Sequence, residues 1–150
     1  MNSRIIDTIK VGVYISVLTL ISSVLIQLTA SIFSNEEQET YKDFYYNFPM
    51  FVFFSPVLES LISILILSLC NAFIGQKSSC IALGLVWAGL HSTMGSSMSS
   101  CIGLWLISFI SFYLYGWLYF KYHFPNLLIN VFVVTLPHSL HNFYVYLLLY

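Results

Sequence analysis

Charged residues are scarce in this chain of 150 residues: Asp, Glu, Lys and Arg together make up 7% of it, whereas hydrophobic residues make up 59%. A soluble domain carries about 25% charged residues, because its surface faces water. This chain cannot cover a globule with polar groups, and we therefore predict that lipid is its solvent. The net charge of −1 excludes a basic surface of the kind that nucleic-acid binding requires, so we expect no nucleic-acid partner.

Cysteine is also scarce, with three residues in the whole chain: Cys70, Cys80 and Cys101. Their odd number and the absence of C-x-x-C spacing argue against a disulfide framework or a zinc knuckle. A free cysteine among apolar neighbours usually packs as a small hydrophobic residue. We expect that role for all three.

Long apolar runs predict an all-α fold, a polytopic transmembrane helix bundle of about five spans, because one span needs about 20 apolar residues. Barrel strands would instead alternate over segments of about ten residues. We expect spans over 11–33, 49–74, 80–94, 101–120 and 127–150. The chain is expected to form one integral membrane domain over 1–150, with a motif-bearing core over about 49–150. The first run is longer than the 7–15-residue core of a signal peptide; a transmembrane helix is therefore preferred, with a cleaved signal peptide as the alternative.

The polar segment over 34–48 is expected to be an extracytoplasmic loop, since its carboxylates lack the spacing of a calcium loop. Shorter turns are expected around 75–79, 95–100 and 121–126. The positive-inside rule then favours a cytoplasmic N-terminus, because four of the five basic residues fall on that side: Arg4, Lys10, Lys77 and Lys121. The aromatic stretch over 105–120 is expected to face lipid and the membrane interface.

Three ionisable residues interrupt the apolar runs, namely Glu59, His91 and His138, and Asn142 follows the last of them by one helical turn. An ionisable side chain at membrane depth is costly and is by default a candidate functional residue. If the helices begin near 49, 80 and 127, each ionisable residue lies roughly 15–16 Å into a hydrocarbon core about 30 Å thick. Their common depth predicts a single site.

Helical spacing predicts which residues share a face with these groups. A stripe of small residues lets two helices approach closely in lipid, and it should turn His91 toward the bundle. Pro137 should bend the last helix, and His141 is assigned a structural role. The expected faces are Ser55, Glu59 and Ser63; Gly84, Ala88, His91 and Gly95; and Thr135, His138 and Asn142.

A glutamate, two histidines and an asparagine suit hydrolysis by an activated water. The carboxylate can act as a general base, and His and Asn donors can stabilise an oxyanion by about 2.7–4 kcal/mol each. A Ser-His-Asp triad is excluded in the predicted core, because residues 49–150 contain no aspartate. No cofactor is expected, although zinc is a candidate, since two histidines and a carboxylate (Glu59, His91 and His138) form a known catalytic zinc set.

Three motifs in chain order resemble the CPBP family, which comprises the type II CAAX prenyl endopeptidases and the bacteriocin-processing, Abi-like membrane proteins. That family carries an E-E-x-x-x-R helix preceded by a proline, then F-x-x-x-H, then H-x-x-x-N. Here "PVLESLISI" matches the first motif through Glu59, and "WAGLH" matches the second through His91, with Trp87 in place of phenylalanine. "HSLHN" matches the third through His138 and Asn142, so the resemblance covers roughly residues 56–142.

The resemblance implies an intramembrane glutamic protease acting on a membrane-embedded or lipidated peptide or protein. Glu59, helped by His91, would activate water, while His138 and Asn142 would hold the oxyanion. The family's second glutamate and its arginine are Ser60 and Ile64 here. A non-catalytic CPBP-like protein, such as a bacteriocin self-immunity factor, is therefore the alternative.

A proton-relaying transporter ranks last, because the ionisable residues cluster at one depth instead of lining a path across the membrane. We expect the bilayer itself as a partner and a bacterial plasma membrane as the location. The residues predict no oligomeric state.

Overall fold

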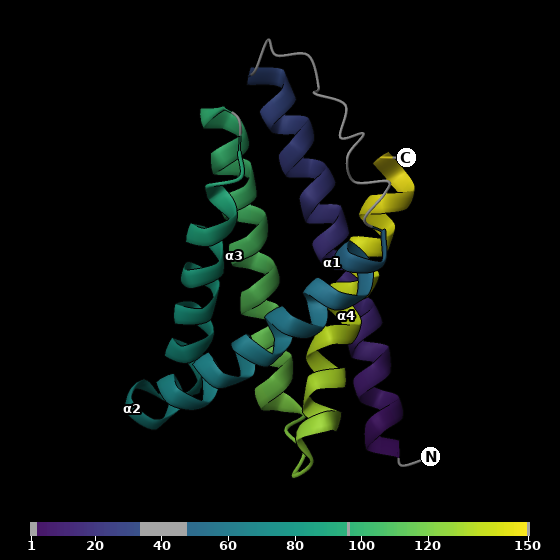
Figure 1. Cartoon of the computed structure of the whole chain (residues 1–150), viewed down its shortest axis with the longest axis vertical. Coiled ribbons are helices and arrows are strands. Elements are labelled where there is room, and N and C mark those ends of the chain that lie inside the picture. Colours follow the sequence, from purple (N-terminus) through teal and green to yellow (C-terminus); the bar gives the residue numbers. More distant parts are fainter. Residues whose placement is uncertain (1–2, 34–47, 96, 150) are drawn as a thin grey trace.

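The computed structural model describes residues 3–33, 48–95 and 97–149, and every element in them is a helix (Figure 1). Four helical stretches of this described part are long and apolar enough to cross a membrane. The predicted all-α transmembrane bundle is therefore confirmed. Its elements are α1 (Ser3–Phe33), the π-helical turn η2 (Met50–Phe54), α2 (Ser55–Ser92), α3 (Met98–Lys121) and α4 (Leu127–Leu149).

Helix α2 folds back on itself at Gly75. The stretch Met50–Ser92 has 43 residues, and a straight helix of that length would measure about 65 Å, twice the thickness of the hydrocarbon core. Gly75 leaves the helical conformation with φ 76° and ψ 168°, a region that glycine adopts readily because it lacks a Cβ. The result is two arms, 55–74 and 76–92, whose reversal is visible in Figure 1. If each arm crosses the membrane, the chain makes about five crossings, as predicted.

The predicted turn over 75–79 is wrong in extent, because only Gly75 leaves the helix. The hydroxyl of Ser79 donates to the Gly75 carbonyl at 2.7 Å, which satisfies a backbone acceptor at the bend. The second arm therefore begins four residues before the predicted start at Cys80. The predicted loop over 34–48 lies, apart from Phe48, outside the described residues.

The N-terminal end of α1 is fastened to the turn between α3 and α4. The Arg4 guanidinium donates to the His123 carbonyl at 3.0 Å and lies over the Phe124 ring, 4.8 Å from its centroid. The side chain of Asn130 closes the same turn, accepting from the Phe124 N–H at 2.8 Å and donating to the Phe124 carbonyl at 2.7 Å. Figure 1 shows the N-terminus, the Gly75 bend and this turn at one end of the bundle. The segments that carry Arg4, Lys10, Lys77 and Lys121 thus gather at one end, as the predicted orientation requires.

Helix α3 packs against all three other long helices, as α4 does. Within the described residues, the backbones of α1 and α2 do not approach each other closely, and α3 and α4 lie against both. The aromatic residues Phe112, Tyr115 and Tyr119 of α3 are consequently buried in the core. The expectation that the stretch over 105–120 faces lipid is wrong for these three, because neighbouring helices cover that side of α3.

Candidate functional site

The two arms of α2 bring pairs of residues together in a register centred on Gly75. Ser63 and Trp87 each lie 12 residues from Gly75, and Glu59 and His91 each lie 16. The Trp87 indole N–H donates to the Ser63 hydroxyl at 3.0 Å, and one helical turn further the His91 ring faces the Glu59 carboxylate. The bend therefore determines which residues of the two arms meet.

Glu59 lies between both histidines. Its Oε2 is 3.9 Å from His91 Nε2 and 3.8 Å from His138 Nε2, and its other oxygen, Oε1, accepts a hydrogen bond from the Ser55 hydroxyl. Both separations exceed the 2.7–3.2 Å of a direct N–H···O bond. Polar groups at such a separation are commonly linked through water. The structure thus brings Glu59, His91 and His138 together from α2 and α4.

The His91 ring is oriented by its own helix. Its Nδ1 is 3.0 Å from the carbonyl of Trp87, and because a carbonyl only accepts, we infer that Nδ1 carries a proton. In the neutral ring, Nε2 is then the unprotonated nitrogen, and it faces Glu59. His91 Nε2 and Glu59 Oε2, which lie on different arms of α2 and can both accept a proton, therefore face each other.

The three side chains meet, as the predicted common depth requires, but the predicted place of His91 at the middle of its helix is wrong. That estimate assumed a helix starting at Cys80, whereas the arm starts directly after Gly75, and His91 lies one residue before the end of α2 at Ser92. The first arm of α2 is strongly inclined to the other helices (Figure 1). The three residues meet because of this inclination and the bend, and not because each sits at the middle of an upright helix.

Asn142 contacts the segment that precedes Glu59. Its amide donates to the Phe51 carbonyl in η2 at 2.9 Å. The Ser55 N–H bonds to the Met50 carbonyl, and the next bond of such a π-helical ladder would join residue 56 to Phe51. Residue 56 is proline and has no N–H, so the Asn142 amide takes that donor's place. Asn142 thereby ties α4 to the segment that precedes Glu59.

The surroundings of His138 are polar although they are buried. Buried polar atoms without a hydrogen-bond partner among the described residues occur beside Glu59 and His138, where each unsatisfied group costs about 1–3 kcal/mol. A purely structural core would rarely keep several of them together. The side-chain exposures of Glu59, His91 and His138 are 14%, 27% and 8%. The unsatisfied atoms are Glu59 Oε2, Ser60 Oγ, Thr135 Oγ1 and His141 Nδ1.

The predicted face Ser55, Glu59 and Ser63 is found on α2, whereas the predicted stripe Gly84, Ala88, His91 and Gly95 is wrong for Gly95, because α2 ends at Ser92. The hydroxyls of Ser55 and Ser63 point to the same side as Glu59, as their hydrogen bonds show. Gly84 lies against Phe109, where an added Cβ would come within 3.0 Å of the Phe109 carbonyl oxygen. This close approach of α2 to α3 accounts for the stripe of small residues. His141 is buried, and the structural role assigned to it stays a prediction.

The two residues that depart from the family pattern, Ser60 and Ile64, are both buried. Ser60 is buried beside Glu59, and its hydroxyl has no partner in the described part of the chain. Ile64 belongs to the apolar core. Neither position supplies the second carboxylate or the cation that the family's first motif would provide.

The residues fit a metal ion poorly. Ligand atoms on a tetrahedral zinc ion lie about 3.3 Å apart, given zinc–ligand distances of about 2.0–2.1 Å, whereas the two nitrogens lie 3.9 and 3.8 Å from the Glu59 oxygen. Within residues 3–33, 48–95 and 97–149, no group of three or more His, Cys, Asp or Glu side chains is arranged as a metal site. We therefore derive no step through a metal.

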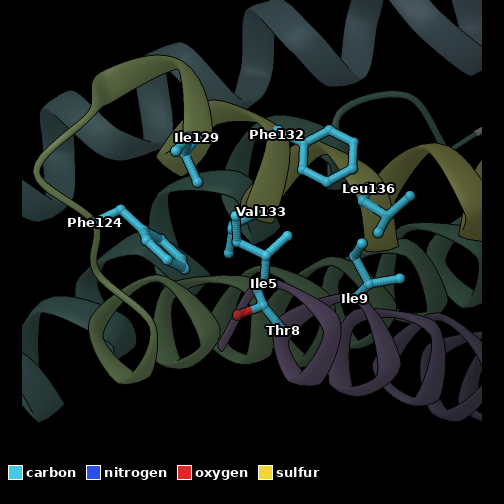
Figure 2. A pocket seen from close by; sticks show the side chains of 8 residues that line it. All are labelled: Ile5, Thr8, Ile9, Phe124, Ile129, Phe132, Val133 and Leu136. Carbon is cyan, nitrogen blue, oxygen red and sulfur yellow. The ribbon is translucent and has the colours of Figure 1, made fainter. Parts of the chain in front are cut away.

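A small apolar hollow lies elsewhere, between α1, α4 and the turn that precedes α4. Figure 2 shows its lining, in which Thr8 is the one polar side chain. The Thr8 hydroxyl already donates to the Arg4 carbonyl at 2.7 Å. None of the predicted site residues lines this hollow, so it is separate from the Glu59 cluster.

Sequence reasoning missed Phe112 and Tyr115, which contact the histidine rings. A signal for them was present. Ser108, Ser111 and Tyr115 recur at helical spacing in an otherwise apolar run, and such a stripe marks the face that is turned toward the bundle. All three are buried.

Comparison of the chain with family models, with curated proteins and with solved structures finds no match. The CPBP resemblance thus stays a prediction that rests on the three motifs.

Proposed function

We propose that this protein is an intramembrane endopeptidase that hydrolyses a peptide bond of a membrane-embedded or lipidated peptide or protein. One observation carries the proposal: the Nε2 atoms of His91 and His138 lie 3.9 and 3.8 Å from the same Glu59 oxygen inside a bundle of apolar helices. Such groups are expensive in lipid, and together they are the parts of a water-activating site.

In the proposed reaction, Glu59 accepts a proton from a water molecule while the water oxygen attacks the peptide carbonyl carbon. The unprotonated Nε2 of His91, which faces Glu59 Oε2, accepts a hydrogen bond from the same water and so holds it for this proton transfer. The proton then passes from Glu59 to the leaving nitrogen as the carbon–nitrogen bond breaks. The products are a carboxyl terminus and an amino terminus, so water is the only co-reactant.

The developing oxyanion requires hydrogen-bond donors. A protonated Nε2 of His138 is one candidate, and an Asn142 amide N–H is the other. The amide carries two N–H groups, and one of them already binds the Phe51 carbonyl. We therefore assign Asn142 two tasks, holding η2 against α4 and presenting its second N–H to the substrate.

The proposed substrate class follows from access. The Glu59 side chain lies among helices whose outer faces are apolar, and residues such as Leu58, Leu65 and Leu69 on the same arm are exposed to the surroundings. A segment that is itself in the membrane, or that is anchored there by a lipid, reaches such a site most directly. The proposed location is a bacterial plasma membrane.

A non-catalytic membrane protein of the same family, such as a bacteriocin self-immunity factor, is the second candidate. Two positions favour it. Ser60 and Ile64 stand where the family has a glutamate and an arginine, and Ile64 is embedded in the apolar core. A protein with this role would keep its activity in cells when Glu59 is replaced.

The test replaces Glu59 with glutamine, which retains the shape of the side chain and removes the base. New peptide N-termini are identified by terminal-peptide mass spectrometry in membranes that contain either the wild-type protein or Glu59→Gln. We expect termini that depend on the wild-type protein and are lost in Glu59→Gln, with Glu36→Gln as the matched control that retains them. Identical sets of termini for the wild-type protein and Glu59→Gln would refute the proposal.

A further inference from the structure

We infer that Phe112 and Tyr115 of α3 are positioning residues that hold the rings of His91 and His138 toward Glu59. The inference deepens the proposed function and rests on it for its catalytic meaning. It assigns a task to a helix that supplies none of the predicted catalytic residues. The ring geometry itself can be tested without any cleavage assay.

Phe112 is the common neighbour of both histidines. Its ring centroid lies 5.8 Å from that of His91 and 5.2 Å from that of His138, the latter in an edge-on arrangement with an interplanar angle of 79°. Phe112 also stacks on Trp87 at 4.7 Å and 15°. Since Trp87 is hydrogen-bonded to Ser63, the position of the Phe112 ring is fixed from the side of α2.

Tyr115 covers the His138 ring. The two centroids are 5.3 Å apart and the planes differ by 28°, which is a stacked arrangement. Tyr115 also contacts Phe112 edge to face, at 5.5 Å and 70°. The His138 ring therefore meets two aromatic side chains of α3, in planes that are steeply inclined to each other. Aromatic pairs of these geometries contribute about 0.5–1.5 kcal/mol beyond the area that they bury.

His138 depends on these contacts more than His91 does. The His91 ring is held by the hydrogen bond of its Nδ1 to the Trp87 carbonyl, whereas no hydrogen bond from within the described ranges orients the His138 ring. Rotation about the bond that carries the ring would swing its Nε2 away from Glu59. The stack on Tyr115 and the edge contact with Phe112 oppose that rotation.

The alternative is that Phe112 and Tyr115 merely fill the core, and α3 offers a matched control for it. Tyr119 is buried on the same helix and contacts His123 edge to face at 5.2 Å. His123 lies in the turn after α3 and belongs to no proposed site. Tyr119→Leu and Tyr115→Leu each remove one buried aromatic ring from α3. Only Tyr115→Leu removes a ring that contacts His138.

The first experiment records the NMR signals of the ring protons of histidine in the full-length protein, labelled at its four histidines and reconstituted in lipid nanodiscs. Single His→Gln variants assign the signals. In the wild-type protein we expect the His138 signal to be displaced from its random-coil position by the neighbouring rings. A His138 signal at the random-coil position would overturn the inference without any further variant.

The second experiment compares variants. Tyr115→Leu should move the His138 signal, Phe112→Leu should move those of His91 and His138, and Tyr119→Leu should move that of His123 alone. Tyr115→Phe keeps the ring and should leave the His138 signal near its wild-type position. A His138 signal that ignores Tyr115→Leu, or that responds equally to Tyr119→Leu, would contradict the inference.

The kinetic readout applies to cleavage of a peptide identified by the terminal-peptide experiment. Tyr115→Leu should lower kcat by up to about 100-fold with little change in KM, because misplacement of a catalytic group by about 1 Å can cost that much. Tyr115→Phe should restore kcat. An unchanged kcat for a folded Tyr115→Leu variant would overturn the inference. If the wild-type protein cleaves nothing while the NMR results hold, the proposed function fails and the ring geometry stands.

Discussion

Glu59 has two oxygens in different surroundings. Oε1 accepts the hydrogen bond of Ser55, and Oε2 faces His91 and His138. A carboxylate held through one oxygen can accept a proton through the other without turning. We therefore predict that Ser55, one helical turn before Glu59, contributes to the proposed reaction by holding the carboxylate.

Replacing Ser55 with alanine should lower the rate of cleavage by about tenfold or more, because a hydrogen bond to a charged group is worth about 1.5–3 kcal/mol. Ser55→Thr retains the hydroxyl and should recover most of the activity. The rates are measured on the same peptide in the same vesicles. Equal rates for Ser55→Ala and the wild-type protein would show that the Ser55 bond does not position Glu59.

The spacing of the candidate ligand atoms leads to a second prediction. Because the two nitrogens lie 3.9 and 3.8 Å from Glu59 Oε2, wider than a zinc ion requires, we expect cleavage to persist in 1,10-phenanthroline. The measurement is the rate before and after incubation with the chelator. If the chelator abolished cleavage and added zinc restored it, the mechanism would be that of a metalloprotease and not that of a glutamate that activates water without a metal.

That Glu59, His91 and His138 lie together could be predicted from the sequence, because ionisable side chains are costly in apolar runs and gather where they find polar partners. The partner of Asn142 could not. It depends on the missing N–H of Pro56, in a π-helical turn that no residue pattern distinguishes from an ordinary helix. The histidine partners of Phe112 and Tyr115 were also out of reach, because the stripe of polar residues on α3 marks its buried face but does not show which helices pack against that face.

The two arms of α2 form the element that aligns the site. Predicting a helix break near residue 75 was possible, because Gly75 begins a short polar segment. The length of the break could not be predicted. The backbone of Gly75 alone makes the reversal, and the Ser79 hydroxyl satisfies the carbonyl that the break exposes. The four-residue error in the start of the second arm misplaced His91 along its helix, which it nearly ends.

Insertion of one alanine after Ser78 tests the register of the two arms. One added residue advances the second arm by about 1.5 Å and rotates it by about 100°, which turns His91 and Trp87 away from Glu59 and Ser63. We expect cleavage to be lost while the protein still enters the membrane. One alanine inserted after Glu37, in the 34–47 segment, is the control and should leave cleavage intact. Retained cleavage with the first insertion would contradict the role of the Gly75 register.

The described part of the molecule has its basic segments at one end. The contact of Arg4 with the turn after α3 places the N-terminus there, and the Gly75 bend and that turn lie at the same end in Figure 1. The bundle and its approximate number of crossings could be predicted from composition and run length alone. Which apolar residues of α3 are buried could not be predicted, because apolar residues that face lipid and those that face other helices look alike in the sequence.

Membrane orientation is tested by labelling single cysteines with an impermeant maleimide, after Cys70, Cys80 and Cys101 have been changed to alanine. Lys77 and Thr93 are both exposed and lie at opposite ends of the second arm of α2. Lys77→Cys should react from the cytoplasmic side and Thr93→Cys from the opposite side, because the basic end stays inside. Labelling of both cysteines from one side would show that this arm does not cross the membrane.

The central claim is that Glu59 and His138, on different helices, act as one hydrolytic unit. The most direct measurement compares the initial cleavage rates of Glu59→Gln, His138→Gln and the double variant in reconstituted vesicles. We predict that each single change lowers the rate by about 100-fold or more and that the double change lowers it little further, because residues that act as a unit lose their effect together. Losses that multiply in the double variant, or single variants that cleave at the wild-type rate, would contradict the claim.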